Sequence, residues 1–573
     1  MKKISKSIGA LLLLAGPFIW AQAQLPFLEN KTLTYAQIIE TYQALDEIYS
    51  NAQLLEVGTT DSGRPLHLFL IQNQPFFGEQ TLAQLRGDKL VILVNNGIHP
   101  GESCGIDASI LWAQSMLEKG VPENQLIAII PVYNVGGALN RGAYSRANQN
   151  GPQEHGFRGN TQNLDLNRDF VKAEALNTKS FFALFQALQP HIFVDTHTSN
   201  GANYQYTMTL ISTQRDKLAA PLAKLLSEDL EPFLYQKMAD KKWEMTPYVN
   251  VFGRPPNWGM QAFLETPRYA SGYTALFNTL GFITETHMLK PYPDRVKSTL
   301  AFLETLTEYS SQQGEKIKQA RAKAFALDAT KKSFATQWVV DSTQKQMLDF
   351  KGYAYRYAQS PLGDYRVLRY DTTQPRTFPV DYYPNYKAKD SARVPKYFVL
   401  PQAYRQVVER LQYQNIEMER LPKDTVMEVL STYCLEADFS TSPYEGKHPI
   451  KNLITEQKVQ QRLFLKGDFL ISTQQENIRF LMAVLAPTAV DSYLRWNFFD
   501  IIFQQKEHFS AYVFEETARA LVAKDAALKK ALEEWKAAHP QKATNTYAVL
   551  QFIYQHSPYY EQEHRRYPVV QIF

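Results

Sequence analysis

The stretch LVILVNNGIHPGE, residues 90–102, decides the architecture of the N-terminal half of this chain. Its five leading apolar residues predict a strand of a central sheet. His99 and Glu102 follow directly, three residues apart in a turn that leads into a helical pattern from Cys104. At this spacing both side chains can face one ion. The stretch therefore predicts a strand that ends at a pair of metal ligands.

A second apolar run ends in Asp195-Thr196-His197, far downstream of the first. The end of another strand is where a third ligand to the same ion has to come from. Two imidazoles and one carboxylate form a three-ligand zinc set that leaves the fourth tetrahedral position open for water. An open position distinguishes catalytic from structural zinc, so these residues predict a zinc hydrolase.

Short apolar runs alternate with helical patterns between about residues 66 and 289. This alternation predicts an α/β domain with a mixed, mostly parallel central sheet flanked by helices. Open sheets of this kind place their sites at the carboxyl ends of strands, where His99, His197 and Glu285 all fall. The expected strands are 67–71, 89–95, 126–132, 191–196 and 281–285, and the expected helices are 104–119, 177–188 and 219–234.

The amino terminus has the pattern of a secretory signal peptide over residues 1–23. Lys2, Lys3 and Lys6 precede an apolar stretch too short for a comfortable membrane span, and Ala21-Gln22-Ala23 offers a small-x-small cleavage site. We expect cleavage after Ala23, a secreted or periplasmic location, and no transmembrane segment in the mature chain. An amino-terminal anchor helix is the alternative.

The composition indicates a globular protein and gives no support for nucleic acid as a partner. The 573-residue chain is 45% hydrophobic and 21% charged, which is ordinary globular composition for two or more domains. Loss of residues 1–23 removes three lysines and no acid, lowering the formal net charge from +4 to +1 and giving no electrostatic case for nucleic acid. Cys104 and Cys434 are the only cysteines, so no cysteine zinc site is possible, and two buried free thiols are expected.

The pattern changes from about residue 330 onward, after a long polar helix expected over 294–327 with a weak point at 310–314. We therefore divide the mature chain into a catalytic domain, 24–325, and an α+β accessory domain of unknown role, 326–573. Tyrosine-rich alternation predicts strands at 353–357 and 365–370. Helices are expected at 402–414 and 514–538. The aromatic residues around Trp496 are interpreted as core.

Four motifs in residues 35–305 resemble the zinc carboxypeptidases of the carboxypeptidase A type. His99-x-x-Glu102 is similar to the first ligand pair of that family, and His197 to its third ligand. The resemblance implies the family's fold and one Zn²⁺ per chain, held by these three side chains.

The second and third motifs concern the substrate. Asp165-Leu166-Asn167-Arg168 resembles the family's D-x-N-R segment, and Arg158 stands where the family has an arginine facing the scissile carbonyl. The resemblance implies that Arg168, assisted by Asn167, grips a free terminal carboxylate, for which the planar guanidinium fork is suited. It also implies that Asp165 orients His99, and that Arg158 stabilises the oxyanion.

The fourth motif is Gly281-Phe282-Ile283-Thr284-Glu285, which resembles the strand carrying the family's catalytic glutamate. Glu285 is thereby implied as general base and acid. The family's mobile tyrosine would be Tyr269 or Tyr273, both closer to the glutamate than the family pattern has it. No aspartate stands between Tyr269 and Glu285, which disfavours a basic C-terminal residue in the substrate.

These motifs predict a zinc metallocarboxypeptidase acting on peptides with a free C-terminal carboxylate. A muropeptide peptidase of the cell wall or an N-acyl amino-acid deacylase could use the same zinc site. A peptide-binding protein that kept a metal site is the non-enzymatic alternative. The sequence leaves the preferred side chain and the oligomeric state open.

Overall fold

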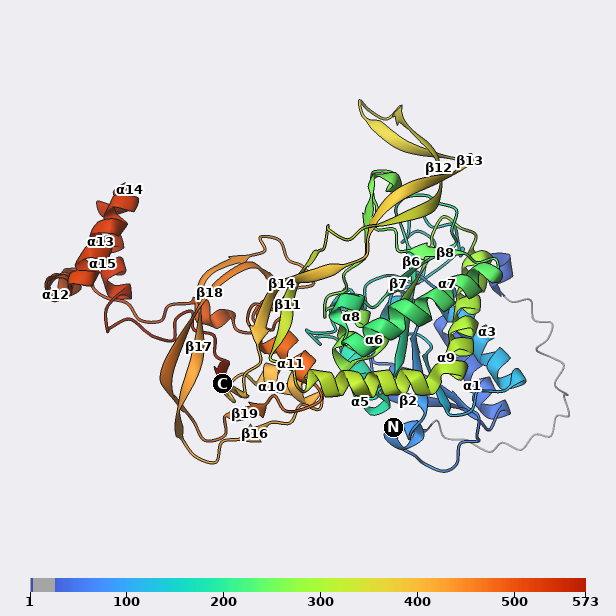
Figure 1. Ribbon diagram of the computed structural model, residues 1–573, viewed down its shortest axis with the longest axis horizontal. Coiled ribbons are helices and arrows are strands. Elements are labelled where there is room, and N and C mark those ends of the chain that lie inside the picture. Colours follow the sequence, from blue (N-terminus) through green and yellow to red (C-terminus); the bar gives the residue numbers. More distant parts are fainter. Residues whose placement is uncertain (1, 4–25) are drawn as a thin grey trace.

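The computed structural model describes residues 2, 3 and 26–573 (Figure 1). The predicted signal peptide lies outside the described residues, apart from Lys2 and Lys3, which form the two-residue strand β1. Among the helices of the described part, none is both long and apolar enough to span a membrane.

A nine-stranded sheet forms the centre of the N-terminal half. Strands β5, β4, β6 and β10 run parallel, whereas β2 and β3 on one side and β7 on the other join antiparallel to their neighbours. This confirms the mixed, mostly parallel sheet. In spatial order the strands are β1 (Lys2–Lys3), β2 (Ala52–Thr59), β3 (Pro65–Gln72), β5 (Gln125–Ile130), β4 (Leu90–Asn95), β6 (Ile192–Ser199), β10 (Leu280–His287), β7 (Met208–Ser212) and β8 (Met245–Pro247).

Both faces of this sheet are buried, because alternate residues of β4 pack into two different cores. Ile92 and Val94 join the core under one set of helices, and Val91 and Leu93 join the core under the other. The first set is α1 (Tyr35–Ile48), α3 (Cys104–Lys119), α6 (Ala220–Leu225), α7 (Glu231–Asp240) and α9 (Tyr292–Asp328). The second is α2 (Leu82–Arg86), α5 (Leu176–Leu188) and α8 (Ala270–Thr274).

Local sequence sets several helix limits. Thr34 and Gln37 form a capping box at the start of α1. The predicted weak point of the long helix is a kink in α9, where Gln313 leaves helical geometry beside Gly314.

The second core continues into the C-terminal region, whose buried Phe480 and Trp496 belong to it. A six-stranded antiparallel sheet dominates this region. Its strands are, in order, β16 (Glu419–Arg420), β19 (Phe469–Ser472), β15 (Tyr397–Leu400), β20 (Val570–Ile572), β17 (Thr425–Phe439) and β18 (Ile450–Phe464).

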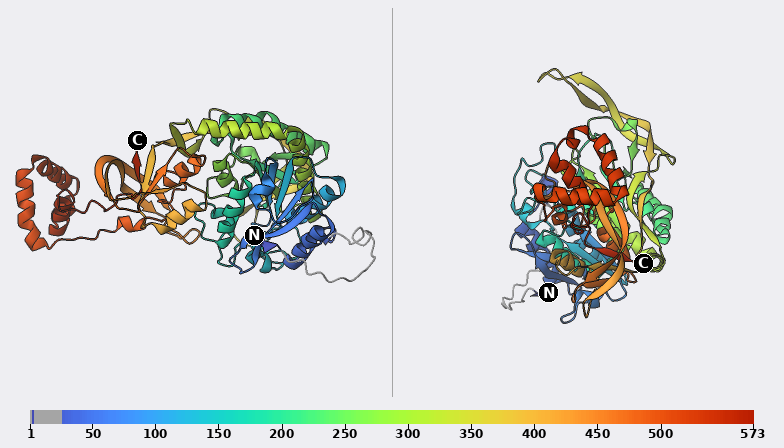
Figure 2. Two further views of the ribbon diagram at one scale, coloured as in Figure 1. Left: turned by 90° about the horizontal axis from the view of Figure 1, so that it is seen from below. Right: turned by 90° about the vertical axis from the view of Figure 1, so that its left-hand side faces the viewer.

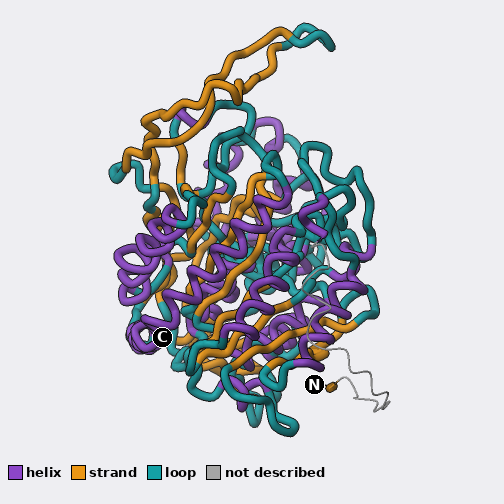
Figure 3. Tube along the Cα trace, turned by 90° about the vertical axis from the view of Figure 1, so that its right-hand side faces the viewer, coloured by secondary structure: helices purple, strands orange, loops and turns teal. Residues whose placement is uncertain are grey.

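Two hairpin-like pairs link this region to the N-terminal half. β11 (Ser333–Val340) pairs with β14 (Tyr386–Arg393). β12 (Gln346–Gln359) pairs with β13 (Arg366–Tyr383), and the end of β13 pairs with β9 (Met260–Gln261). The far end of the hairpin formed by β12 and β13 projects from the molecule (Figures 1 and 3). Helices α10 (Arg405–Gln412) and α11 (Ile478–Leu485) complete the region's packing.

A helical group lies at the far end of the molecule (Figure 2) and has a small core of its own. The single helix expected over 514–538 is wrong, because the structure has two helices there. Asp525 separates them: its side chain accepts hydrogen bonds from the first amides of α13 and so starts a new helix. The group comprises α12 (Ala511–Lys524), α13 (Ala526–Ala538), α14 (Pro540–Ala543) and α15 (Thr546–Gln555).

Asp107 on α3 joins three segments of the chain. Its carboxylate accepts hydrogen bonds from the hydroxyls of Thr32, at 3.0 Å, and Tyr292, at 2.5 Å. Burial raises the pKa of Asp107 to about 7, although both hydrogen bonds oppose the shift. The carboxyl group loses its proton near pH 4 in the unfolded chain but only near pH 7 in the folded protein. The contribution of this group to stability therefore falls as pH rises from about 4 to 7.

Asp107→Asn should remove this pH dependence while keeping an oxygen acceptor. We expect the free energy of unfolding of the variant to exceed that of the wild type by more at pH 8 than at pH 5. The extra gain should be on the order of 1 kcal/mol for each pH unit between pH 5 and the folded pKa of about 7. Urea unfolding of both proteins across this range measures it, and parallel pH profiles would refute the buried carboxyl as the cause.

Candidate active site

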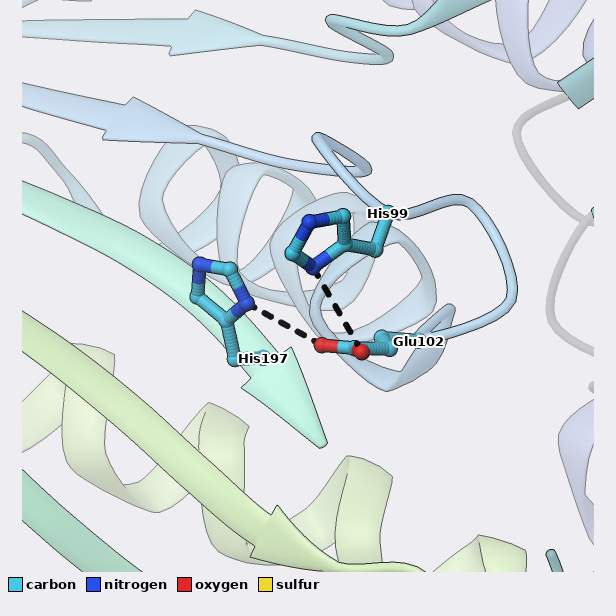
Figure 4. Close-up of side chains that lie close together, drawn as sticks. All are labelled: His99, Glu102 and His197. Carbon is cyan, nitrogen blue, oxygen red and sulfur yellow. Dashed lines mark hydrogen bonds and ion pairs between the residues drawn. The ribbon is translucent and has the colours of Figure 1, made fainter. Parts of the chain in front are cut away.

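Three of the predicted side chains converge at the carboxyl ends of β4 and β6. The ligand atoms of His99, Glu102 and His197 all lie within 4.8 Å of one another, and the three residues are buried (Figure 4). Glu102 Oε1 lies 3.5 Å from His99 Nδ1, and Glu102 Oε2 lies 3.0 Å from His197 Nδ1. The Glu102 amide donates to the His99 carbonyl at 2.8 Å, and this tight turn brings the two side chains together.

The outward-facing nitrogen of each imidazole is held by a carboxylate. His99 Nε2 lies 2.9 Å from Asp165 Oδ1, and His197 Nε2 lies 2.9 Å from Asp195 Oδ2. Carboxylates in these positions fix the tautomer and orientation of zinc-binding histidines. The resemblance implied that Asp165 orients His99. The same role of Asp195 toward His197 was not predicted, although Asp195 stands two residues before His197 on the same strand.

The donor set fits zinc. Nδ1 of His99 is buried without a hydrogen-bond partner among the described residues, an arrangement that is costly unless an ion binds there. Burial would raise the pKa of Glu102, but Arg146 and the two histidines hold it well below its ordinary value, so the ligand is a carboxylate. Two imidazole nitrogens and a carboxylate oxygen are typical zinc ligands.

Two arginines surround the carboxylates of the site. Arg158 binds Asp165 through Nε, at 2.9 Å, and Nη2, at 2.8 Å, and its Nη1 lies 3.5 Å from Glu102 Oε1. Its side chain is 43% exposed, so part of the guanidinium remains open to a ligand. Arg146 was not anticipated by any motif. It donates to Glu102 Oε1 at 2.8 Å and to the Thr198 carbonyl at 3.0 Å.

Asn167 and Arg168 lie beside the histidines. Asn167 Nδ2 lies 3.5 Å from His197 Nε2, and its Oδ1 accepts from the amide of Ala270. The Arg168 guanidinium stacks on the ring of Tyr269, 4.4 Å from its centre, and donates to the Asn167 carbonyl at 2.8 Å. Asn167 and Arg168, which are predicted to bind the terminal carboxylate of the substrate, thus form one cluster with Tyr269.

Glu285 lies on β10 directly beside His197 on β6, in parallel register. Paired residues of neighbouring strands project from the same face of a sheet, so the carboxyl group faces the region of the histidines. Burial raises the pKa of Glu285 to about 7, with the positive charge of His197 opposing the shift. A carboxyl group with a pKa near neutrality can both accept and donate a proton.

The structure corrects the interpretation of Tyr273. Its side chain is 0% exposed, packs among phenylalanines of the core and donates its hydroxyl to Gln414 at 2.6 Å. It is therefore a core residue and not a gate. Tyr248, which no motif indicated, does lie near the site: burial and the charge of Glu285 raise its pKa. Cys104 and Cys434 are buried and free, as expected.

Part of the chain is similar to known proteins in sequence and in structure. Residues 38–242 match the family model described as zinc carboxypeptidase. No curated protein matches the chain. Among solved structures, a metallo-carboxypeptidase from Pseudomonas aeruginosa in complex with (2-guanidinoethylmercapto)succinic acid is 16% identical, over 49% of this chain and 68% of its own, with a TM-score of 0.35.

Two further solved structures are similar over about half of the chain. Carboxypeptidase A from Helicoverpa armigera is 14% identical, over 52% of this chain and 75% of its own, with a TM-score of 0.36. Bovine thrombin-activatable fibrinolysis inhibitor, in complex with tick carboxypeptidase inhibitor, is 10% identical, over 51% of this chain and 99% of its own, with a TM-score of 0.36. The family match covers His99, Glu102 and His197, so residues 38–242, with their cluster of zinc-type ligands, are similar to the zinc carboxypeptidase family.

Proposed function

We propose that this protein is a zinc-dependent metallocarboxypeptidase that removes the C-terminal residue from peptides. The observation that carries the proposal is the arrangement of one site: three zinc-type ligands, a neighbouring carboxyl group on β10, and a guanidinium within the same cluster. A zinc ion bound at His99, Glu102 and His197 would act as a Lewis acid on the peptide carbonyl and on water.

The remaining chemistry falls to the chain's own residues. Glu285 accepts a proton from the attacking water and then donates it to the leaving amine, a role that suits its raised pKa. Arg158 stabilises negative charge on the carbonyl oxygen. Arg168, with Asn167, holds the terminal carboxylate of the substrate and so sets the bond that is cleaved.

We place this activity outside the cytoplasm, in the secreted or periplasmic fraction. The support is the signal-peptide pattern of residues 1–23, with cleavage after Ala23. Sequencing the amino terminus of the protein exported by its native host tests this location. An amino terminus at residue 24 supports it, and a retained Met1 on a cytoplasmic protein contradicts it.

Arg168→Lys tests the carboxylate grip. Lysine keeps the positive charge but lacks the planar guanidinium, which is held by the bond from Nη1 to the Asn167 carbonyl while another nitrogen binds the carboxylate. We expect kcat/KM for peptides with a free carboxy terminus to fall by about 10- to 100-fold, mainly through KM. Steady-state kinetics with N-acetyl dipeptides measures the effect.

The matched control is Arg519→Lys, in an exposed ion pair with Glu515 on α12, which should leave the kinetics unchanged. For C-terminally amidated forms of the same dipeptides, Arg168→Lys should lower kcat/KM only slightly, since these peptides lack the charge that Arg168 binds. An equal loss on free and amidated peptides would contradict the assigned role.

A further inference from the structure

The C-terminal region reaches the proposed substrate site through the turn between β17 and β18, residues 440–449. Tyr444 and Lys447 exchange backbone hydrogen bonds at 2.8 and 3.1 Å across this turn. Glu445 and Gly446 between them have φ values of +51° and +71°, which is the backbone of a tight two-residue turn. The turn therefore presents its side chains on a defined backbone.

Three polar contacts dock this turn onto the segment that carries Asp165 and Arg168. The Tyr444 hydroxyl accepts a hydrogen bond from Arg168 Nε at 3.0 Å. Glu445 Oε2 accepts from the backbone amide of Asp165 at 2.8 Å, and Lys447 Nζ pairs with Glu174 at 2.7 Å. The contacts come from three successive parts of the turn, so its orientation over the segment is fixed.

Aromatic packing holds the Tyr444 ring in place. The ring stacks on Trp496 with centres 6.1 Å apart, and the Arg268 guanidinium lies 5.1 Å from the Trp496 ring and 6.0 Å from that of Tyr444. Asp491 in turn binds Arg268 Nε and the Trp496 indole nitrogen. The hydroxyl is thus positioned beside Arg168 without depending on its own hydrogen bond alone.

Two hydrogen-bond donors at this junction have no acceptor among the residues that the structure describes. The Tyr444 oxygen accepts from Arg168, but its own hydrogen has no acceptor among the described residues: the guanidiniums of Arg168 and Arg268 beside it carry only donors, and Glu445 Oε2 accepts from the Asp165 amide. Arg168 uses Nε and Nη1, whereas Nη2 makes no hydrogen bond within the described chain. A carboxylate, with two acceptor oxygens, matches such a pair of adjacent donors.

We propose that Tyr444 is a second binding residue for the substrate's terminal carboxylate, supplied to the active site by the C-terminal region. This inference rests on the proposed carboxypeptidase function. Tyr444 accepts from Arg168 Nε and donates its own hydroxyl hydrogen to one carboxylate oxygen, while Arg168 Nη2 donates to the carboxylate. The C-terminal region then contributes to the substrate site, because residues 24–325 alone would lack this donor.

Tyr444→Phe tests the inference, because it removes the hydroxyl and retains the ring that packs on Trp496. We expect KM for N-acetyl dipeptides to rise about tenfold with kcat changed less than threefold, as for loss of one hydrogen bond to a charged group. The dissociation constant of the free product amino acid, measured by calorimetry on the zinc-loaded protein, should rise by a similar factor. Affinity for the amidated amino acid should not change.

Tyr433→Phe is the matched control, since within the described residues its hydroxyl bonds Gln460 on the neighbouring strand β18, away from the site, and it should behave as the wild type. An active enzyme whose Tyr444→Phe variant binds the product as tightly as the wild type would overturn the inference alone. Tighter binding or a lower KM in the variant would also overturn it, by showing that the turn obstructs the site. A wild-type protein that neither cleaves the peptides nor binds their products would refute the proposed function as well.

Discussion

Glu285→Gln is expected to lower kcat for peptide hydrolysis by about 10²- to 10⁴-fold, the range that general acid–base catalysis contributes. Glutamine has nearly the same shape as glutamate but cannot take up or release a proton. Glu285 lies beside His197 in the sheet, with a pKa raised to about 7 by burial. The carboxamide avoids the cost of burying a charge, so the fold should tolerate the change.

The variant should keep one zinc per chain, because Glu285 is not among the three clustered ligands. It should also keep the KM of the wild type within a few fold, which separates loss of chemistry from loss of binding. Glu315→Gln is the control, since Glu315 is an exposed ion-pair partner of Lys318 on α9. Near-normal turnover by Glu285→Gln would show that another group moves the proton.

Removal of the metal is expected to abolish hydrolysis, with at least a 10³-fold fall in kcat/KM, since zinc would supply both the polarised carbonyl and the reactive water. Dialysis against a chelator, followed by addition of one equivalent of Zn²⁺, should remove and restore activity. Mg²⁺ should not restore it, because two of the three ligands are imidazoles and Mg²⁺ prefers oxygen.

Zinc should also stabilise the fold, because it binds the assembled ligands and not the unfolded chain. The metal-free protein should therefore unfold at a lower temperature, and the difference should vanish in a His197→Ala variant that lacks one ligand. Full activity after complete removal of zinc would contradict the account. A restored activity without any change in thermal stability would place the metal elsewhere.

Much of the N-terminal half could be predicted because its local patterns and its tertiary structure agree. Residues 90–94 form a strand and His99 and Glu102 a turn, and both follow from contiguous sequence. The ends of β4 and β6 then meet because neighbouring parallel strands end at the same edge.

Contacts between segments that are distant in the chain could not be predicted from the sequence alone. Arg146 reaches Glu102 from a loop without a motif, and Tyr444 reaches Arg168 from 276 residues away. Tyr273 was misjudged because a motif does not show which of two nearby tyrosines is turned into the core. In the helical group, the capping power of Asp525 outweighed the helical propensity around it.

The most direct test of the central claim is the position of the metal. Diffraction data collected on either side of the zinc absorption edge should show one strong anomalous peak per chain, within about 2.0–2.2 Å of His99 Nδ1, a Glu102 oxygen and His197 Nδ1. A peak at any other set of residues, or a zinc-loaded crystal without a peak at these three, would contradict the account.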